Sequence, residues 1–287
     1  MHYSVTIVTL CAATLLEICT VNNLIMEVLG YVLTVAIGVL VGLFGGGGSI
    51  LTVPVLVYLF MIPATLATTY SLALVSISSL IAAVPYVLKK QVSYKRALQF
   101  GVPSLITLYV VRAFVLPAIP QRFHWLGVVV DKNTLMLVFF SVLMLVSGFF
   151  MIRKRKSEPD CLDCPYNSLV LIFAGLAEGV ITGVVGAGGG FIIVPVLMIF
   201  GKLNMKQAVA NSLLIIGVKS LIGFLGSHNV LSLNFSLLAT LLTIAIVGML
   251  LGLQLNKKLD AKQLKPLFGY FVVAMGIFIL FKEFIIK

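Results

Sequence analysis

The chain has 287 residues, of which 61% are hydrophobic and only 10% are charged, and its formal net charge is +11. A soluble globular protein needs about 25% charged residues to cover its surface, so this composition predicts a multi-pass membrane protein and excludes the soluble classes. The positive charges lie in short clusters between apolar runs, which favours the bias of cytoplasmic membrane loops over a basic face for nucleic acid. Neither a nucleic acid partner nor a cofactor is expected.

A helix that spans the membrane needs about 20 mostly apolar residues. Apolar segments that predict helices occur at 4–21, 24–45, 49–61, 65–88, 97–119, 134–152, 168–186, 190–201, 207–226, 235–255 and 266–286. Two of them, 49–61 and 190–201, are too short to span unless they are tilted or buried between other helices. The first segment is interpreted as a retained helix and not as a signal peptide, because it lacks a basic start and carries Glu17.

The chain contains an internal repeat. Residues 42–82 align without gaps with residues 183–223, at a constant offset of 141, and 14 of these 41 positions are identical. Four glycines and a proline match in register, which apolar composition alone would not produce. Such half-repeats are typical of transporters. The sequence therefore predicts an N-terminal helix at 1–23, a first transmembrane repeat at 24–152, a linker at 153–167 and a second transmembrane repeat at 168–287.

The basic residues indicate the orientation of the two repeats. They cluster at Lys89–Arg96, Arg153–Lys156, Lys202–Lys206 and Lys257–Lys265. All four clusters fall on the cytoplasmic side if each short segment crosses, or nearly crosses, the membrane. Each repeat then holds five segments, so the second repeat is inverted relative to the first. The predicted fold is an all-α polytopic membrane protein of two inverted repeats in the cytoplasmic membrane.

Runs of glycine interrupt both repeats at equivalent positions. Bare backbone in hydrocarbon must be covered by protein or by a watery cavity. A glycine run also leaves several N–H groups at the start of the next helix, where the helix dipole favours an anion. The alternative is close helix packing through small residues. The residues expected at the anion site are Gly46, Gly47, Gly48 and Ser49 in the first repeat and Gly188, Gly189 and Gly190 in the second.

Arg112, Glu178 and Lys219 are ionisable residues inside apolar runs. A charge at that depth is expensive and indicates a functional role. Arg112 is expected either to bind substrate or to extend toward the outer interface, and Lys219 either to capture an anion or to form an ion pair. Burial favours the neutral form of a carboxyl group unless a cation pairs with it. Glu178 is therefore interpreted either as a proton carrier or as the static partner of Lys219.

Ser71, Asn211 and Ser212 lie near the start of the helices that follow the short segments. Hydroxyl and amide groups suit the oxygens of an oxyanion, so these residues are candidate substrate ligands. The alternative is hydrogen bonding between helices, worth roughly 0.6 kcal/mol for each bond.

Cys161 and Cys164 form a lone C-x-x-C motif in the linker. A structural zinc site needs four ligands, and neither a histidine nor a second cysteine pair lies near them in the sequence. The motif is interpreted as two reduced loop thiols, and no metal site is expected.

The doubled pattern Gly-x-x-Gly-x-Gly-Gly-Gly/Ser, followed by Val-Pro-x-Leu and by Ala208–Leu213 in the second copy, resembles the TauE/SafE sulfite exporter family over residues 24–285. The resemblance implies secondary transport, and export in particular, of a small sulfur-containing anion such as sulfite or an organosulfonate. The first copy departs from the pattern. Ser49 stands where the second copy has Gly190, and Tyr70 stands where it has Asn211.

Other functions remain as alternatives to a secondary transporter. No G-x-x-x-x-G-K-[S/T] motif occurs, so coupling to protons or to the membrane potential is expected in place of ATP. An anion channel is the first alternative, and an intramembrane enzyme, which needs convergent catalytic groups, is the second. The expected partners are the small anion and membrane lipid. The sequence leaves open whether the protein works as a monomer or as a homodimer.

Overall fold

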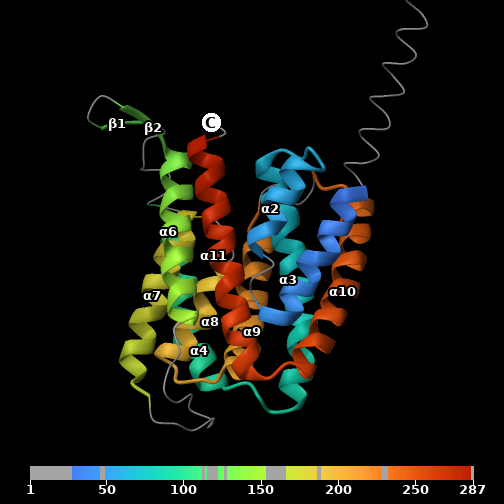
Figure 1. Ribbon diagram of the computed structural model, residues 1–287, viewed down its shortest axis with the longest axis vertical. Helices are drawn as coiled ribbons and strands as arrows, with labels where there is room; N and C mark the ends of the chain where they lie inside the picture. The colour runs from blue at the N-terminus through green and yellow to red at the C-terminus, as the bar shows by residue number, and fades with distance from the viewer. Residues whose placement is uncertain are drawn as a thin grey trace, which may run out of the picture.

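The structure is a computed structural model that describes residues 28–45, 49–111, 114, 122–125, 128–152, 166–185, 189–227 and 232–285. These residues form a bundle of helices whose axes run mostly along one direction (Figure 1). The predicted helix at 4–21 and the Cys161–Cys164 motif lie outside the described residues.

The helices closely follow the predicted apolar segments. The first repeat contains an unlabelled helix at Val28–Phe44, then α2 (Ser49–Tyr58), α3 (Ala64–Leu88), α4 (Tyr94–Val110) and α6 (Lys132–Ile152). The second repeat contains α7 (Ser168–Val185), α8 (Gly190–Ile199), α9 (Met205–Leu225), α10 (Phe235–Lys258) and α11 (Ala261–Ile285). The predicted all-α membrane fold is therefore confirmed.

One short element departs from the all-helical prediction. Between the predicted apolar segments 97–119 and 134–152, strand β1 (Arg122–Trp125) pairs antiparallel with strand β2 (Val128–Asp131). Aromatic and β-branched residues favour extended backbone, and these two strands consist largely of such residues. The hairpin lies beyond the end of α6, outside the helical bundle (Figure 1).

Four of the described helices are long and apolar enough to cross a membrane. These stretches are Leu66–Leu88, Met205–Leu225, Phe235–Lys258 and Gln263–Phe281. By contrast, α2 and α8 have 10 residues each. At 1.5 Å per residue each of them is about 15 Å long, half of the roughly 30 Å of hydrocarbon. Neither short helix spans the bilayer by itself.

Equivalent helices of the two repeats run in opposite directions along the bundle (Figure 1). Helix α3 descends from the end that carries the β-hairpin, whereas α9, its equivalent, rises toward that end. Helix α2 rises and α8 descends. This arrangement is the one that an inverted repeat requires. The inversion relative to a membrane stays a prediction.

The first helix of each repeat packs against the fourth helix of the other repeat. A Cβ atom at Gly38 would lie 2.2 Å from the Ala245 carbonyl oxygen, and a Cβ atom at Gly179 would lie 2.4 Å from the Ser104 carbonyl oxygen. These two contacts are equivalent, because the offset of 141 relates Gly38 to Gly179 and Ser104 to Ala245. Small residues let helix backbones approach closely in a membrane, so the same device joins the two repeats twice.

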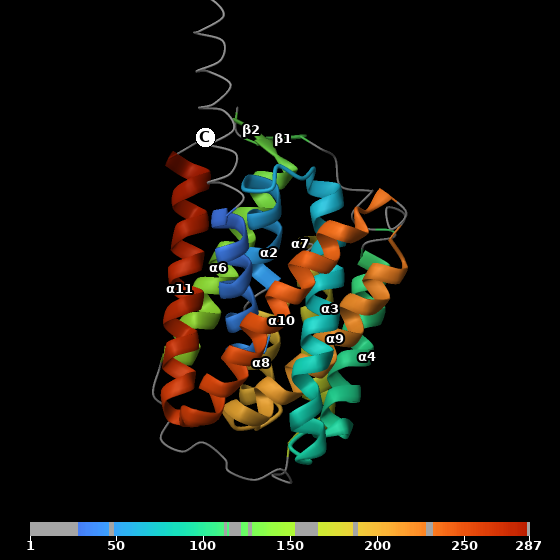
Figure 2. The same ribbon diagram turned by 90° about the vertical axis from the view of Figure 1, so that its right-hand side faces the viewer.

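Two further pairs of helices also join the repeats. Helix α3 packs along α9, and α6 packs along α11. Figure 2 shows α3 and α9 near α4 on one side of the bundle and α11 with α6 on the other. The main hydrophobic core lies among these helices and includes Phe44, Phe100, Ile193 and Phe268. The repeats are therefore interleaved and do not form separate lobes.

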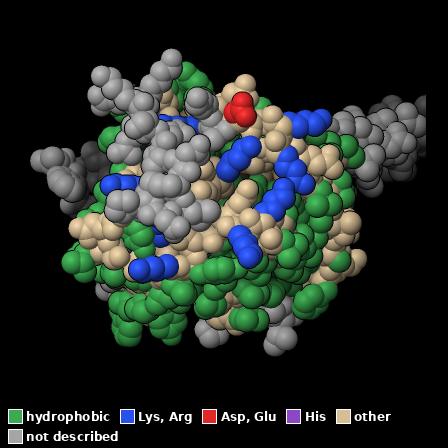
Figure 3. All heavy atoms as spheres, turned by 90° about the horizontal axis from the view of Figure 1, so that it is seen from below, with side chains coloured by type: hydrophobic (Ala, Val, Ile, Leu, Met, Phe, Trp, Pro, Cys, Tyr) green, Lys and Arg blue, Asp and Glu red, His purple; other side chains and the backbone are tan. Residues whose placement is uncertain are grey.

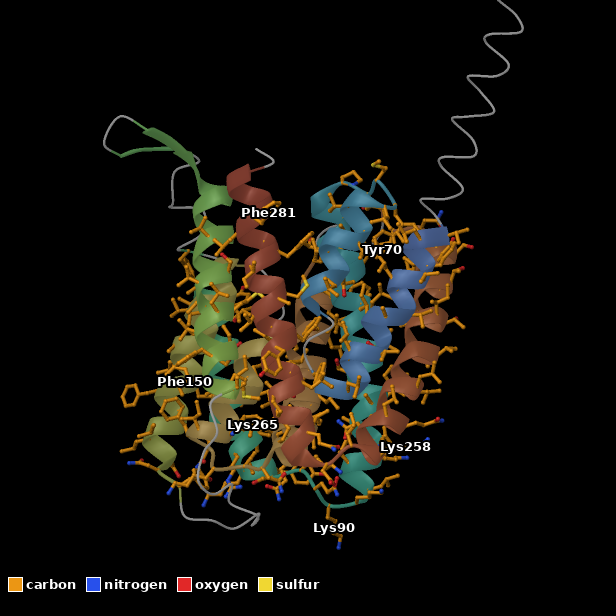
Figure 4. The ribbon with its side chains drawn as sticks, viewed as in Figure 1. Tyr70, Lys90, Phe150, Lys258, Lys265 and Phe281 are labelled. Carbon is orange, nitrogen blue, oxygen red and sulfur yellow. The ribbon has the colours of Figure 1, made fainter. Side chains whose placement is uncertain are left out.

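Lysine and arginine side chains gather at one end of the bundle. Figure 3 shows them scattered over the end face, with hydrophobic side chains around its rim. Lys90, Lys258 and Lys265 all lie at this end, opposite the β-hairpin (Figure 4). The two basic loops thus share one end, as the predicted topology requires.

We expect single cysteines at Gln91 and Lys262 to react with a membrane-impermeant thiol reagent only after the cell is opened, because both positions lie near the basic end of the bundle. A cysteine at Lys132, at the start of α6, should react in intact cells. The measurement is labelling in a background from which the native cysteines have been removed. Labelling of position 262 from outside would contradict this orientation.

Candidate functional site

Three polar side chains meet inside the bundle. Glu178 lies on α7, Lys219 on α9 and Ser104 on α4. The Lys219 ammonium nitrogen lies 2.9 Å from Glu178 Oε2 and 3.1 Å from Oε1, and it donates to Ser104 Oγ at 2.7 Å. The Ser104 hydroxyl donates in turn to Glu178 Oε2. Each member of the cluster is thus hydrogen-bonded to the other two.

The cluster is shielded from solvent. Glu178 and Ser104 are 1% and 0% exposed, and Lys219 is 7% exposed. Two unpaired charges at such a place would each cost several kcal/mol, whereas a close pair with a further hydrogen bond compensates much of that penalty. Only the ionised forms of both partners give this compensation in full. The geometry is therefore that of a buried ion pair.

Close packing of α4 against α7 brings Ser104 to Glu178. A Cβ atom at Gly175 would lie 2.5 Å from the Phe100 carbonyl oxygen, and the Gly179 contact with the Ser104 backbone follows one turn later. Without side chains at these two positions, the α4 backbone approaches α7 closely enough for a short serine side chain to reach the carboxylate. The cluster thus combines one residue from the first repeat with two from the second.

The second glycine break lies directly against the cluster. Gly189 has a φ of 70° and caps the N-terminus of α8. A Cβ atom there would lie 2.3 Å from Glu178 Oε1 and 2.3 Å from Thr182 Cγ2. Glycine is required at this position for two reasons. Left-handed backbone disfavours other residues, and the Glu178 and Thr182 side chains occupy the place that a Cβ atom would take. The carboxylate therefore lies beside the start of α8.

At the equivalent place in the first repeat, the described residues carry no charged group. At the offset of 141, Ser78 corresponds to Lys219, Ile37 to Glu178 and Ala245 to Ser104. All three line a small cavity of about 10 Å³, together with Thr34 and Thr52, which is roughly the space of one water molecule. The two repeats thus share a backbone arrangement but differ in the chemistry they place there.

An apolar groove reaches Lys219 from the side of the bundle. It lies between α4 and α9, has a volume of about 270 Å³, and its lining includes Leu98, Val102 and Ile222, which are partly exposed. In a bilayer this face contacts lipid tails. Apolar side chains of the groove lie near the aliphatic part of Lys219, and Lys219 is the charged residue in the groove lining.

Asn211, a predicted ligand, has its amide group committed to the protein. Its Nδ2 donates to the Gln207 carbonyl at 2.7 Å, and its Oδ1 accepts from the Ser93 backbone N–H at 3.1 Å. Tyr70, which stands at the equivalent position, accepts in the same way from the Asn234 backbone N–H at 2.7 Å. Each of the two residues therefore binds the N-cap residue of the fourth helix in the other repeat. The two copies thus make the same hydrogen bond to this backbone N–H with different side chains.

Ser212, the neighbouring candidate, lies at the first glycine break. Its hydroxyl donates to the Val209 carbonyl at 2.9 Å, and a Cβ atom at Gly45, whose φ is 78°, would lie 2.5 Å from it. The first break therefore contacts α9 of the second repeat. Ser71 is buried on α3. The roles of Ser71, Asn211 and Ser212 as substrate ligands stay predictions.

The remaining predicted residues are only partly visible. Gly46, Gly47, Gly48, Gly188 and Arg112 lie outside the described residues, and for Ser49 only the backbone is described, as the first residue of α2. Gly190 is buried and begins α8. The structure thus brings together Gly189, Glu178 and Lys219 from the predicted set.

Sequence reasoning missed two polar residues that the structure places at helix contacts. Ser104 follows Pro103 in an apolar run, and only its position opposite Gly179 distinguishes it. Asn256 is buried on α10, where its Nδ2 donates to the Leu43 carbonyl at 2.5 Å and its Oδ1 accepts from the Tyr86 hydroxyl at 3.0 Å. Leu43 lies in the last turn of its helix, where carbonyl groups lack helical partners.

Nothing in the described part of the chain resembles a metal centre, since no three His, Cys, Asp or Glu residues lie close enough together there to hold an ion. The chemistry available at the cluster is therefore that of an ammonium group, a carboxylate, a hydroxyl and the N–H groups at the start of α8. These groups bind anions and exchange protons.

The sequence matches the family model described as "Sulfite exporter TauE/SafE" over residues 31–279, which is most of the chain. The chain belongs to the TauE/SafE family. The match covers both repeats, including Glu178, Lys219 and Ser104, so the buried cluster lies within the family's shared region. Together with the long apolar helices, membership in this family identifies the chain as a multi-pass membrane protein.

Three curated relatives of this TauE/SafE protein match over nearly their whole length. A "Probable membrane transporter protein" of Xylella fastidiosa (strain Temecula1) is 28% identical and covers 86% of this chain and 92% of its own. Proteins with similar names from Methanocaldococcus jannaschii and Bacillus subtilis (strain 168) are each 26% identical, covering 85% and 86% of this chain and 91% and 96% of their own. No solved structure matches.

We expect Gly189→Ala to destabilise the protein, because the added Cβ both meets the Glu178 carboxylate and forces alanine into left-handed backbone, which costs about 1–2 kcal/mol alone. The matched control is Gly101→Ala, where the nearest atom would lie at an ordinary 3.4 Å. Thermal unfolding of purified protein measures both. Equal melting temperatures for Gly189→Ala and the parent would show that the break tolerates a side chain.

We expect Lys219→Met and Glu178→Gln each to lower the free energy of unfolding by about 3–5 kcal/mol, because each leaves a buried partner without its counter-charge. The double variant should lose much less than the sum of the two, since no charge remains to be compensated. Unfolding of the parent, both single variants and the double variant gives the coupling energy. Additive losses would mean that the two residues contribute independently.

Proposed function

We propose that this membrane transporter is a secondary transporter that exports a small sulfur-containing anion, sulfite or an organosulfonate, across the cytoplasmic membrane. The description of its family supports the class of cargo. The observation that carries the proposal is the buried cluster of Lys219, Glu178 and Ser104 beside the Gly189 break. It combines a cation, a hydroxyl donor and a helix N-terminus at one place inside the bundle.

These groups suit an oxyanion for simple physical reasons. A desolvated anion must regain several kcal/mol from its binding site, and a charge-assisted hydrogen bond from an ammonium group is stronger than a neutral one. The Ser104 hydroxyl adds a second donor. The first N–H groups of α8 add a favourable dipole next to Gly189.

The position of the cluster between the repeats suits alternating access. Ser104 comes from the first repeat, whereas Glu178 and Lys219 come from the second. Helices α4 and α7 pack closely together, so a motion of α9 against this pair would change the contacts of a bound anion.

The coupling ion follows from the groups present. No nucleotide-binding motif occurs in the chain, so the gradients of protons and of the anion itself, and not ATP, supply the energy. Glu178 is the acid in contact with Lys219 in the described part of the chain, and it is the group we assign to proton coupling. Sulfite flux into liposomes that saturates and depends on a pH gradient supports the transporter, whereas flux without saturation indicates a channel.

We expect Lys219→Met to weaken the binding of sulfite by at least about tenfold, or roughly 1.4 kcal/mol, because methionine keeps the unbranched stem and removes the ammonium group. Lys206→Met, at the start of the same helix and away from the cluster, is the matched control and should bind sulfite as the parent does. Titration with sulfite at fixed pH measures both. Unchanged affinity in Lys219→Met would remove this lysine from the binding site.

A further inference from the structure

The Glu178 carboxylate lies where an external anion would be held. The Lys219 ammonium group donates to both of its oxygens, the Ser104 hydroxyl donates to Oε2, and the Gly189 backbone at the start of α8 lies against Oε1. An ammonium group, a hydroxyl and a helix N-terminus are the groups that bind a small oxyanion. In this structure they surround an anion that belongs to the protein.

We propose that Glu178 acts as a tethered anion that occupies the transport site, and that a substrate anion takes its place only after Glu178 has taken up a proton. The inference rests on the proposed function and gives the coupling rule for the same site. Two negative charges cannot share one ammonium group in a low dielectric without a large penalty. Once a carboxylate oxygen of Glu178 is protonated, Lys219 is available to another anion.

The balance of charge also selects the substrate. Before exchange the cluster holds one positive and one negative charge. After exchange it holds the Lys219 ammonium group, a neutral Glu178 and the substrate, so the sum remains zero only for a monovalent anion. One proton enters with each anion and leaves with it. A divalent anion would leave one negative charge uncompensated in the membrane, which is expensive. The site therefore takes hydrogen sulfite or a sulfonate.

The neighbouring helices supply no other charge in contact with Glu178 in the part of the chain that the structure describes. Helix α7 carries no second ionisable residue, and α8 carries none. Lys95 and Arg96 lie more than two turns from Ser104 on α4, and the Arg96 guanidinium lies 4.6 Å above the Tyr166 ring. The other ionisable groups on α4, α6 and α9 are Tyr94, Tyr109, Lys132 and Lys206. Among these groups, Lys219 is the charged group in contact with Glu178.

Methanesulfonate is a suitable probe, because it carries one negative charge throughout the range from about pH 5.5 to 8.5 and its own protonation does not interfere. Because one proton is taken up with each anion, we expect the dissociation constant of the parent protein to rise with pH, by up to about tenfold for each pH unit. In Glu178→Gln the dissociation constant should not change with pH, and at pH 8 it should be at least about tenfold lower than that of the parent.

Two matched variants complete the experiment. Glu178→Asp retains a carboxyl group and should retain the pH dependence. Ser78→Ala changes the position equivalent to Lys219 in the first repeat, outside the cluster, and should also retain it. If Glu178→Gln does not fold, the pH dependence of the parent and of Glu178→Asp decides the question.

Binding to the parent that does not vary with pH would overturn the inference, as would a Glu178→Gln variant that binds no more tightly than the parent at pH 8. Binding of sulfite that strengthens as the pH rises and the divalent ion accumulates would overturn it and leave the proposed function standing, because the exchange requires a monovalent oxyanion. Binding of neither anion would overturn both.

Discussion

The direct approach of helix backbones from opposite repeats is the constraint on which the rest of this structure depends. Gly38 and Gly179 place their helices against the carbonyl groups of Ala245 and Ser104. Because a side chain at either glycine would separate the helices, the presence of Ser104 next to Glu178 follows from the absence of a side chain at Gly179. The buried ion pair, the position of α8 and the interleaving of the repeats all follow from this close packing.

The repeats have the same backbone geometry and different chemistry. The offset that converts Gly38 into Gly179 also converts Ile37 into Glu178 and Ser78 into Lys219. One repeat therefore holds an ion pair where the other holds a small cavity with hydroxyl groups in its lining. A structure with two equal sites would hold two ion pairs in the membrane and would bear the penalty of burying charge twice. Placing the ion pair in one repeat leaves the equivalent place in the other repeat without a charged group among the described residues.

Much of the fold was predictable because hydrocarbon imposes strong rules on sequence. Helix lengths, the breaks at the glycine runs and the pairing of equivalent segments all follow from the need to satisfy backbone groups in lipid. Glu178 and Lys219 were identifiable because an ionisable residue in an apolar run is rare. An ion pair between Glu178 and Lys219 was one of two interpretations of these residues, and the structure shows the contact between them.

The rest of the site depends on contacts that no local pattern encodes. Ser104 is an ordinary polar residue in an apolar helix, and it enters the cluster only because α4 packs on a helix of the other repeat. Likewise, Tyr70 departs from the pattern that has Asn211 in the second copy, yet both residues bind a backbone N–H of the opposite repeat. A phenol and an amide differ as residue types and are equivalent as acceptors, and only the three-dimensional contact shows this.

The interleaving of the repeats has a consequence for the synthesis of the protein and its insertion into the membrane. The helix at Val28–Phe44 packs against α10, which begins at Phe235. Ribosomes add about 5–20 residues each second, so the glycine face of this helix waits on the order of 10–40 s before its partner is made. During that interval Gly38 lies against lipid or against whatever assists insertion. The nascent first repeat therefore lacks packing partners for its first helix. The protein completes its tertiary structure only when the last third of the chain has entered the membrane.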